Sequence, residues 1–329
     1  METQKWKEKG KSHFLDLRTL AWALFNRSYS LKRLCEELHT EHQKIDHEPS
    51  GEVTVEEIEY ARQDGRCTMD ALNGLKEECD KHPINLNPCH AYSPASVAKS
   101  YLDAMGIIRP AEKFKVSPKH SGIAMQTYYG GRSETRIRCT EVPVVPVDFT
   151  SEYPTCCVLS GLFDILTAAR ITFKDDTAGV RRLLKEISLD RCFGPTLWKQ
   201  FNFFALVQPD NDILPVRTVY DGVTQNIGNN YLTSDTPLWF AGCDVIASAI
   251  RTRKPPRILR AIRIVSHGKQ AGMKSVKLRG SMVEINPYTD DLFGKIIEQR
   301  KLNKGDKKLY YWLKILANSI YGFFVELIP

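Results

Sequence analysis

The sequence predicts a protein of several domains that combines α/β and α+β parts. Its 329 residues are enough for two or three domains. Hydrophobic residues make up 42% of the chain and charged residues 26%, which is the balance of a globular protein with a buried core. Turn-rich stretches at 81–95 and 128–132 separate helical patterns from β-branched runs. Together these observations favour a mixed, multidomain fold.

The first third of the chain is expected to contain a strand and two helices. Residues 14–40 predict a strand followed by a helix. Residues 54–78 predict a longer helix, because Thr54 and Glu57 form a capping box ahead of an apolar pattern. The apolar face of that helix is predicted to contain Ile58, Ala61, Met69 and Leu72.

The remaining elements alternate between helices and strands. In chain order we expect a helix from Ser93 to Met105, a strand that ends at Asp148, a helix over 179–187, strands over 256–286, and helices over about 289–302 and 307–321. The joint Asn303-Lys304-Gly305-Asp306 is short, so the last two helices should form an antiparallel hairpin.

The basic residues are concentrated in two segments. The net charge is +7, but residues 251–279 hold ten Lys or Arg residues and no Asp or Glu. Residues 295–314 hold seven basic and two acidic residues. This local asymmetry indicates a surface for a polyanion such as nucleic acid. The alternative is a solvated charged face.

Several classes of protein are disfavoured by what the sequence contains. No apolar run reaches the roughly 20 residues that a membrane span requires, and the N-terminus has no signal-peptide pattern. We therefore expect a cytoplasmic protein with no membrane partner. The nine cysteines are scattered, which predicts reduced thiols. One cluster leaves a zinc site open: Cys79, His82, Cys89 and His90.

The last predicted helix carries a polar stripe on one face. Steps of four, three, four and three connect its five members, Lys307, Tyr311, Lys314, Asn318 and Tyr321. Cations, an amide and two rings suit a nucleoside triphosphate better than a core. Arg300 and Lys304, also four apart, are expected to point into the same cleft. The alternative is a basic amphipathic hairpin with one buried tyrosine.

The pattern Lys-x-x-x-Asn-Ser-x-Tyr-Gly at 314–322 resembles motif B of the family B DNA polymerases. The resemblance implies that four residues hold the triphosphate of the incoming dNTP: Arg300, Lys304, Lys314 and Asn318. It also implies that Tyr321 supports the nascent base pair.

A second segment, Asp-Phe-Thr-Ser-Glu-Tyr-Pro at 148–154, resembles motif A of the same family. The resemblance implies that Asp148 and the backbone carbonyl of Phe149 bind Mg²⁺ in a two-metal centre. It implies that Tyr153 lies under the sugar and excludes ribonucleotides. Glu152 departs from the family pattern, which usually has an apolar residue there.

Two weaker motifs extend the resemblance towards the N-terminus. The turn Tyr-Tyr-Gly-Gly-Arg resembles the Tyr-x-Gly-Gly element of the family, which implies DNA contacts by Tyr128, Gly130, Gly131 and Arg132. Tyr60 and Asp64 resemble the Tyr-x-x-x-Asp motif of its 3′–5′ exonuclease domain. The alternatives are a plain glycine turn and an ordinary surface helix.

Tyr288-Thr289-Asp290-Asp291 resembles the Tyr-x-Asp-Asp motif of reverse transcriptases but precedes a helix instead of lying in a β-hairpin. We therefore interpret Thr289 or Asp290 as a helix N-cap.

The resemblance divides the chain into five segments. They are a partial RNase H-like exonuclease domain at 1–82, a linker with the Tyr-x-Gly-Gly element at 83–140, a partial palm sheet at 141–287 with room for an insertion, a two-helix antiparallel fingers hairpin at 288–322, and the start of a palm continuation at 323–329.

The expected function is that of a DNA-directed DNA polymerase fragment, which adds dNTPs to a 3′ end with Mg²⁺. Its expected partners are a DNA primer–template and a dNTP, with a terminal protein if priming uses a protein. The upstream Asp-x-Glu and the downstream Asp-Thr-Asp of the family are missing, so this chain is expected to be inactive alone. The alternative is a non-catalytic nucleic-acid-binding protein.

Overall fold

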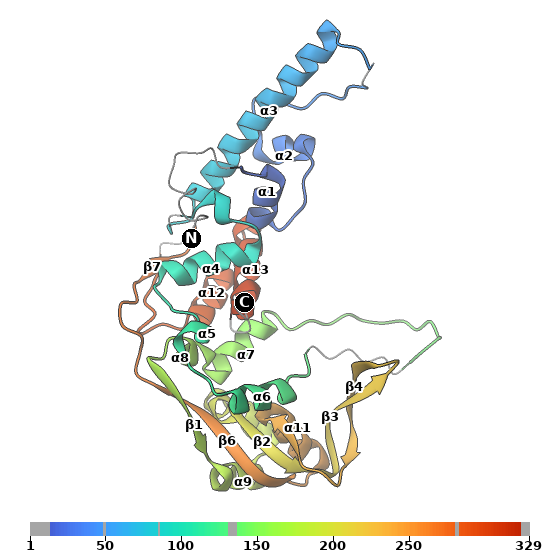
Figure 1. The fold of residues 1–329 in the computed structure, drawn as a ribbon, viewed down its shortest axis with the longest axis vertical. Helices are drawn as coiled ribbons and strands as arrows, with labels where there is room; N and C mark the ends of the chain where they lie inside the picture. The colour runs from blue at the N-terminus through green and yellow to red at the C-terminus, as the bar shows by residue number, and fades with distance from the viewer. Residues whose placement is uncertain (1–13, 49–50, 85, 131–136, 280–282, 324–329) are drawn as a thin grey trace, which may run out of the picture. The chain divides into compact units, whose positions relative to one another are not determined.

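The computed structural model describes residues 14–48, 51–84, 86–130, 137–279 and 283–323 (Figure 1). They form two compact units, one from the described residues of Met1–Ile108 and Gly272–Glu326, the other from Arg109–Ala271. The first unit therefore contains the segment with Tyr60 and Asp64 together with the C-terminal hairpin. Within the described ranges, no helix is both long and apolar enough to cross a membrane.

The first unit is almost entirely helical. Its elements are α1 (Leu17–Phe25), α2 (Leu31–Leu38), α3 (Val55–Asp80), the 3₁₀ helix η1 (Pro88–His90), α4 (Pro94–Ala104), the short strands β7 (Val276–Lys277) and β8 (Glu284–Ile285), α12 (Leu292–Leu302) and α13 (Lys307–Phe323). Helix α4 packs on α1 and α13, and α3 packs on α1 and α2. At the α4–α13 contact the rings of Tyr101 and Trp312 lie 5.7 Å apart, and both side chains are buried.

The expected strand near residue 14 is wrong, because these residues form α1. The side chain of Asp16 accepts a hydrogen bond from the Arg18 N–H at 3.0 Å and caps the helix. Leu20 and Leu24, four residues apart, are both buried. Asn26 adopts the left-handed conformation and ends the helix. The helical spacing of the buried leucines therefore prevails over the alternation of a strand.

The predicted helix over 54–78 exists as α3, but it buries another face than expected. Thr54 accepts a hydrogen bond from the Glu57 N–H at 3.2 Å, as the capping pattern predicts. Ile58 is 43% exposed and Met69 is 57% exposed. The buried positions are Cys67, Ala71, Leu75 and Cys79. Smaller side chains at steps of four let α1 and α2 approach the C-terminal half of α3.

The second unit is built around a four-stranded sheet. Its elements are α5 (Pro110–Lys113), α6 (Pro118–Thr127), α7 (Glu152–Ser160), α8 (Leu162–Leu166), β1 (Arg170–Asp175), α9 (Thr177–Glu186), α10 (Leu189–Cys192), η2 (Pro195–Phe201), β2 (Phe203–Gln208), β3 (Asp210–Tyr220), β4 (Val223–Thr233), β5 (Leu238–Ala241), α11 (Gly242–Thr252) and β6 (Arg257–His267). The sheet order is β1-β6-β2-β5, and every neighbouring pair is antiparallel. Strands β3 and β4 form a separate hairpin.

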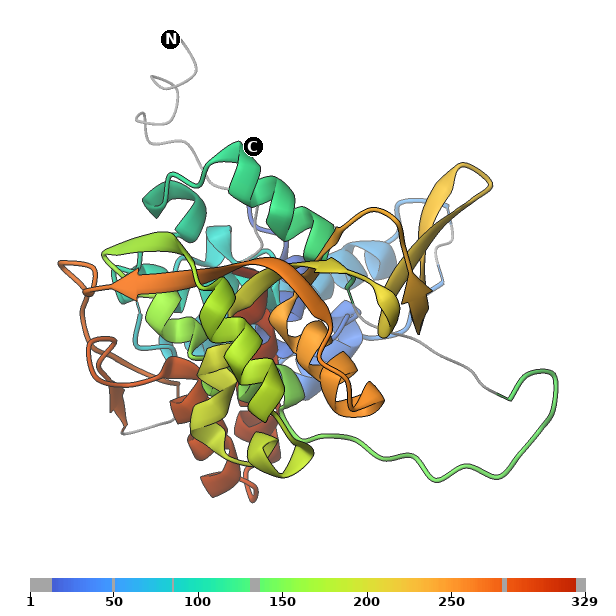
Figure 2. The ribbon, with the colours of Figure 1, turned by 90° about the horizontal axis from the view of Figure 1, so that it is seen from below.

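Both faces of this sheet are covered by helices. Along β2 buried and half-buried residues alternate, and Phe203, Ala205 and Val207 point into a core formed with α9, η2 and α11. On the other face α6 contacts β2 and β5, and His120 stacks on Phe173 at 4.0 Å between ring centroids. Figure 2 shows α6 on one side of the strands and α9 and α11 on the other. The expected mixture of α and β structure is confirmed at this level.

The predictions for the other elements have mixed outcomes. Helices are confirmed over Pro94–Ala104 and Thr177–Glu186, and β6 confirms a strand within 256–286. The later strands of that stretch, β7 and β8, contain two residues each. The strand expected to end at Asp148 is wrong, because residues 141–149 belong to none of the described strands.

Candidate functional site

The two C-terminal helices form the hairpin that the sequence predicts. Helix α12 begins after Asp291, whose side chain accepts a hydrogen bond from the Gly294 N–H at 3.0 Å. At the start of α13 the side chain of Asp306 accepts one from the Leu309 N–H, also at 3.0 Å. These carboxylates satisfy backbone donors that each helix start leaves open. The short connection over 303–306 between the end of α12 and the start of α13 makes the helices antiparallel neighbours.

The polar stripe of α13 lies on its exposed face. Lys307, Tyr311, Lys314 and Asn318 are exposed. The side chain of Tyr321, the fifth member, is outside the described residues. Buried positions occupy the opposite face, at Trp312, Leu313, Leu316, Ala317 and Ile320. The helix therefore presents two cations, an amide and a ring to a ligand while it packs through its apolar side.

Arg300 and Lys304 do not share one helical face. Helix α12 ends at Leu302, so Lys304 lies in the connection, where it is exposed. Arg300 is only 7% exposed. Its guanidinium donates a hydrogen bond to the Tyr310 hydroxyl at 3.0 Å and lies 4.4 Å above that ring. Arg300 thus holds the hairpin together in this conformation.

Asp148 lies in a long exposed segment of the second unit. Residues 137–150 run between α6 and α7 without regular structure (Figure 1). Val144, Val145 and Val147 are 79%, 87% and 90% exposed. The expected sheet edge below Asp148 is therefore not formed. Pro143 and Pro146 lack the N–H groups that a regular ladder requires, which weakens the segment as a strand.

The turn after Asp148 leads directly into α7. The Phe149 carbonyl accepts a hydrogen bond from the Glu152 N–H at 3.3 Å. Ser151 has a φ of 56°, in the left-handed region. Tyr153 lies in the first turn of α7 and is 56% exposed. Glu152 is compatible with the start of α7, because an acidic residue suits the first turn of a helix.

The residues of the second motif do not make a complete metal centre. A two-metal site needs several carboxylate or carbonyl oxygens around both ions. Asp148 supplies one carboxylate, and the described parts of the chain contain no group of three or more His, Cys, Asp or Glu side chains placed to hold a metal. The donor set present therefore does not fit a pair of Mg²⁺ ions.

The Tyr-x-Gly-Gly element follows the end of α6. Tyr128 is 59% exposed, and Gly130 has a φ of +70°, a conformation that glycine adopts without strain. Gly131 and Arg132, the other two residues expected to contact DNA, lie outside the described residues. The described half of the element is thus accessible to a ligand.

Sequence reasoning missed the residue that anchors this element, Tyr129. Its ring stacks on Phe240 with centroids 6.3 Å apart, and the Arg217 guanidinium lies 4.1 Å from its centroid. Arg217 also donates hydrogen bonds to the backbone carbonyls of Gln126 and Tyr128. Strand β3 therefore holds the chain just before the glycines. No local signal in the sequence predicts such a long-range contact.

Tyr60 and Asp64 lie on one face of α3, as their spacing predicts, and they share a third partner. The Lys44 ammonium donates to both carboxylate oxygens of Asp64, at 2.7 and 2.6 Å, and to the Tyr60 hydroxyl at 2.8 Å. The His47 ring stacks on Tyr60 at 4.7 Å. The hydrogen bond to Asp64, followed by that to Tyr60, raises the pKa of Lys44.

Lys44 changes what this pair can do chemically. Since its ammonium contacts both oxygens of Asp64, the carboxylate already has a cationic partner within the chain. A lysine at this position can also contact a phosphate. Sequence reasoning missed Lys44 because the contact depends on how the loop before α3 folds back.

Half of the acid-free run at 251–279 is neutralised by acids from other segments. Lys254 pairs with Asp210, Arg260 with Asp175, Arg263 with Asp176, Lys269 with Asp164, and Arg279 with Glu78. The run is therefore rich in unopposed positive charge only along the sequence. In the folded protein, acidic residues from other segments lie beside half of its basic side chains.

The two remaining sequence signals have structural explanations. Cys79 and His82 are buried, whereas Cys89 and His90 lie on η1. The Nδ1 atom of His82 is hydrogen-bonded to the Tyr101 hydroxyl at 2.9 Å. In the acidic pair, Asp290 accepts from the Asn286 N–H at 2.8 Å and Asp291 caps α12. The N-cap interpretation is thus correct in kind and displaced by one residue.

Comparison with known proteins identified no relative of this chain. No family model matches the chain, and no curated protein or solved structure is significantly similar to it.

Proposed function

We propose that this chain is the nucleotide-binding part of a family B DNA polymerase, with an RNase H-like exonuclease segment, a palm segment and the fingers hairpin α12–α13. The observation that carries the proposal is the exposed stripe of α13. Lys314 and Asn318, the two residues implied to bind the triphosphate, are exposed one turn apart above a buried apolar face. Lys314 and Asn318 take no part in the buried face of the helix, so their sequence pattern favours a ligand.

The chemistry of the stripe suits a polyphosphate. The Lys314 ammonium neutralises phosphate charge and donates hydrogen bonds to it. The Asn318 amide adds a donor on the same face one turn further along the helix, since residues four apart face the same side. Lys304 and Tyr153 are accessible for the roles that the resemblance implies. Arg300 would have to leave Tyr310 to reach a phosphate.

Fluorescence anisotropy with a dATP labelled on its ribose tests the proposal. Lys314→Ala should weaken binding by roughly 10–150-fold, because hydrogen bonds to charged groups contribute about 1.5–3 kcal/mol. Lys301→Ala removes an exposed cation from the neighbouring helix and serves as the matched control. Equal affinities for wild type, Lys314→Ala and Lys301→Ala would contradict the assignment of this face.

A second candidate function is nucleic-acid binding without catalysis. It is favoured by the Lys44 ammonium on Asp64, because this carboxylate already has a cationic partner within the chain and a lysine can also contact a phosphate. Electrophoretic shift of a primer–template, together with the dATP anisotropy of the same sample, distinguishes the two functions. Binding of the primer–template without binding of dATP supports the second candidate, and dATP binding that Lys314→Ala weakens supports the first.

A further inference from the structure

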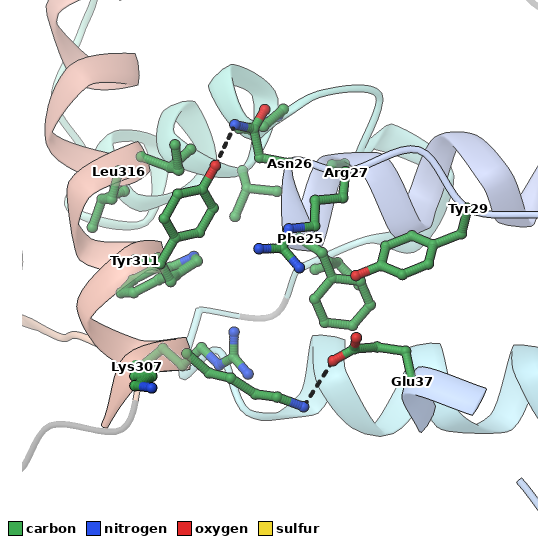
Figure 3. A pocket seen from close by; sticks show the side chains of 16 residues that line it. Phe25, Asn26, Arg27, Tyr29, Glu37, Lys307, Tyr311 and Leu316 are labelled. Atoms are coloured by element: carbon green, nitrogen blue, oxygen red, sulfur yellow. Dashed lines mark hydrogen bonds and ion pairs between the residues drawn. The ribbon is translucent and has the colours of Figure 1, made fainter. Parts of the chain in front are cut away.

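A cavity in the first unit adjoins the N-terminal half of the α13 stripe. Its volume is about 250 Å³. One side is formed by the C-terminal end of α1 and the residues that follow it, and the other by the first turns of α13 (Figure 3). Lys307 and Tyr311 line it, whereas Lys314 and Asn318 do not belong to its lining. The N-terminal half of the stripe therefore faces the cavity, whereas Lys314 and Asn318 lie outside it.

The walls of the cavity are aromatic and its floor is apolar. The rings of Phe25 and Tyr29 lie 5.8 Å apart at an interplanar angle of 74°. Across from them, the Tyr311 hydroxyl accepts a hydrogen bond from the Asn26 side chain at 3.3 Å. Leu24 and Trp312, which are both buried, also line the cavity. The rings are thus held in place before any ligand arrives, which lowers the entropic cost of binding.

The rim of the cavity is cationic. Four basic residues line it, and two of them have acidic partners: Lys308 pairs with Glu37 at 3.0 Å, and Arg279 pairs with Glu78. For Arg27 and Lys307, the described part of the chain offers no ion pair with an acid. The Arg27 guanidinium lies 6.0 Å from the centre of the Tyr311 ring. Two positive charges are therefore available beside an aromatic wall.

We propose that this cavity binds one nucleotide, with its base against the aromatic rings and its phosphate between Arg27 and Lys307. Aromatic rings stack on any base, and the two cations complement the phosphate. The cavity is smaller than the roughly 300–1,000 Å³ of pockets for drug-sized ligands, which favours one ring system over a dinucleotide. The nucleotide is either a free mononucleotide or an unpaired residue of a DNA strand. This site does not depend on Lys314, Asn318 or the polymerase assignment.

Fluorescence of 2-aminopurine tests the site, because stacking on an aromatic ring quenches this base. The full chain is titrated in one arm with 2-aminopurine nucleoside monophosphate and in the other with a single-stranded oligonucleotide that carries one 2-aminopurine. Quenching in the first arm alone identifies a free nucleotide as the ligand, and quenching in the second alone identifies a strand. Absence of quenching in both arms overturns the proposal.

Matched variants assign the quenching to this cavity. Tyr311→Leu should raise the Kd by roughly 5–150-fold, the range that corresponds to the loss of one base–aromatic stack. Arg27→Gln alters an exposed side chain and should raise the Kd several-fold without affecting the fold, which circular dichroism checks.

Two controls separate this site from the rest of the molecule. Lys308→Gln removes a cation that Glu37 already neutralises and should change the Kd little. Lys301→Ala removes an exposed cation that does not line the cavity and should leave the quenching unchanged. The dATP titration of Lys314→Ala is a separate measurement, so this proposal and the triphosphate assignment can fail independently. Wild-type quenching in both Tyr311→Leu and Arg27→Gln would place the base elsewhere and refute the inference.

Discussion

The two segments that carry the family resemblance have opposite structural outcomes. Helix α13 forms as predicted, with a buried face and an exposed polar stripe. The segment that ends at Asp148 was predicted as a strand and is instead exposed and unpaired among the described residues. A helix satisfies its backbone hydrogen bonds within its own sequence, whereas a strand needs a neighbour. A local pattern is therefore sufficient for the first motif but not for the second.

The same contrast occurs between the faces of one helix. On α13 the apolar side chains contact α4, and their loss should be costly. The side chains of Lys314 and Asn318 are exposed, and their loss should affect ligands more than folding. Substitutions at buried positions should therefore lower stability strongly, and substitutions at exposed positions should lower it little.

The largest effect is expected for Trp312→Ala. Trp312 is 7% exposed and lies 5.2 Å from the His82 ring and 5.7 Å from the Tyr101 ring. Its truncation should lower the free energy of unfolding by about 3–5 kcal/mol. Urea denaturation followed by circular dichroism measures this loss. A change below about 1 kcal/mol would show that α13 is not packed on α4 as described.

Acid should destabilise the same contact through His82. Burial, aided by the charge of Arg279, lowers the pKa of His82 to about 3. The unfolded chain has a His pKa near 6.5, so between these values it binds a proton that the folded chain excludes. The free energy of unfolding should therefore fall as the pH decreases below about 6.5, by up to roughly 1.4 kcal/mol for each pH unit.

His82→Gln should remove this pH dependence of the free energy of unfolding. Urea titrations of the variant and of wild type at pH 7 and pH 5 measure it. NMR provides an independent check, because the His82 ring protons should keep constant chemical shifts between pH 5 and pH 8. A normal titration midpoint near 6.5 would mean that the ring is solvated and the contact open.

A smaller effect is expected at Arg217, which anchors Tyr129 at the start of the Tyr-x-Gly-Gly element. Arg217→Ala removes the guanidinium that lies 4.1 Å from the Tyr129 ring and its backbone hydrogen bonds. The variant should lose about 1–2 kcal/mol of stability. Limited proteolysis should then cut the chain near Tyr128 faster than in wild type. Arg251→Ala, at an exposed position of the same unit, is the control and should leave the rate unchanged.

The smallest effect is expected for Val145→Thr. Val145 is 87% exposed, so the substitution should change the free energy of unfolding by no more than about 0.5 kcal/mol. Thermal unfolding compares it with Ala205→Thr, which introduces a hydroxyl into the buried side of β2 and should be clearly destabilising. A large loss at Val145 would show that the segment pairs with another strand and would restore the predicted strand before Asp148.

The sequence by itself determined the elements that depend on local interactions. Helices α3, α4 and α13 follow from caps and periodicity, and the exposure of Lys314 and Asn318 follows from their spacing. The shared face of Tyr60 and Asp64 was equally predictable. In each case the interacting residues are at most a few helical turns apart. The local sequence is therefore enough to predict the interaction.

The tertiary structure decided which of these side chains have partners. It brought Lys44 to Asp64 across 20 residues and Asn26 to Tyr311 across 285 residues. It placed Arg217 on Tyr129 and paired half of the basic run with distant acids. Contacts of this kind depend on how helices and strands pack, and packing is cooperative over the whole unit. No local pattern specifies it, which is why the cavity beside α13 became visible only in the folded chain.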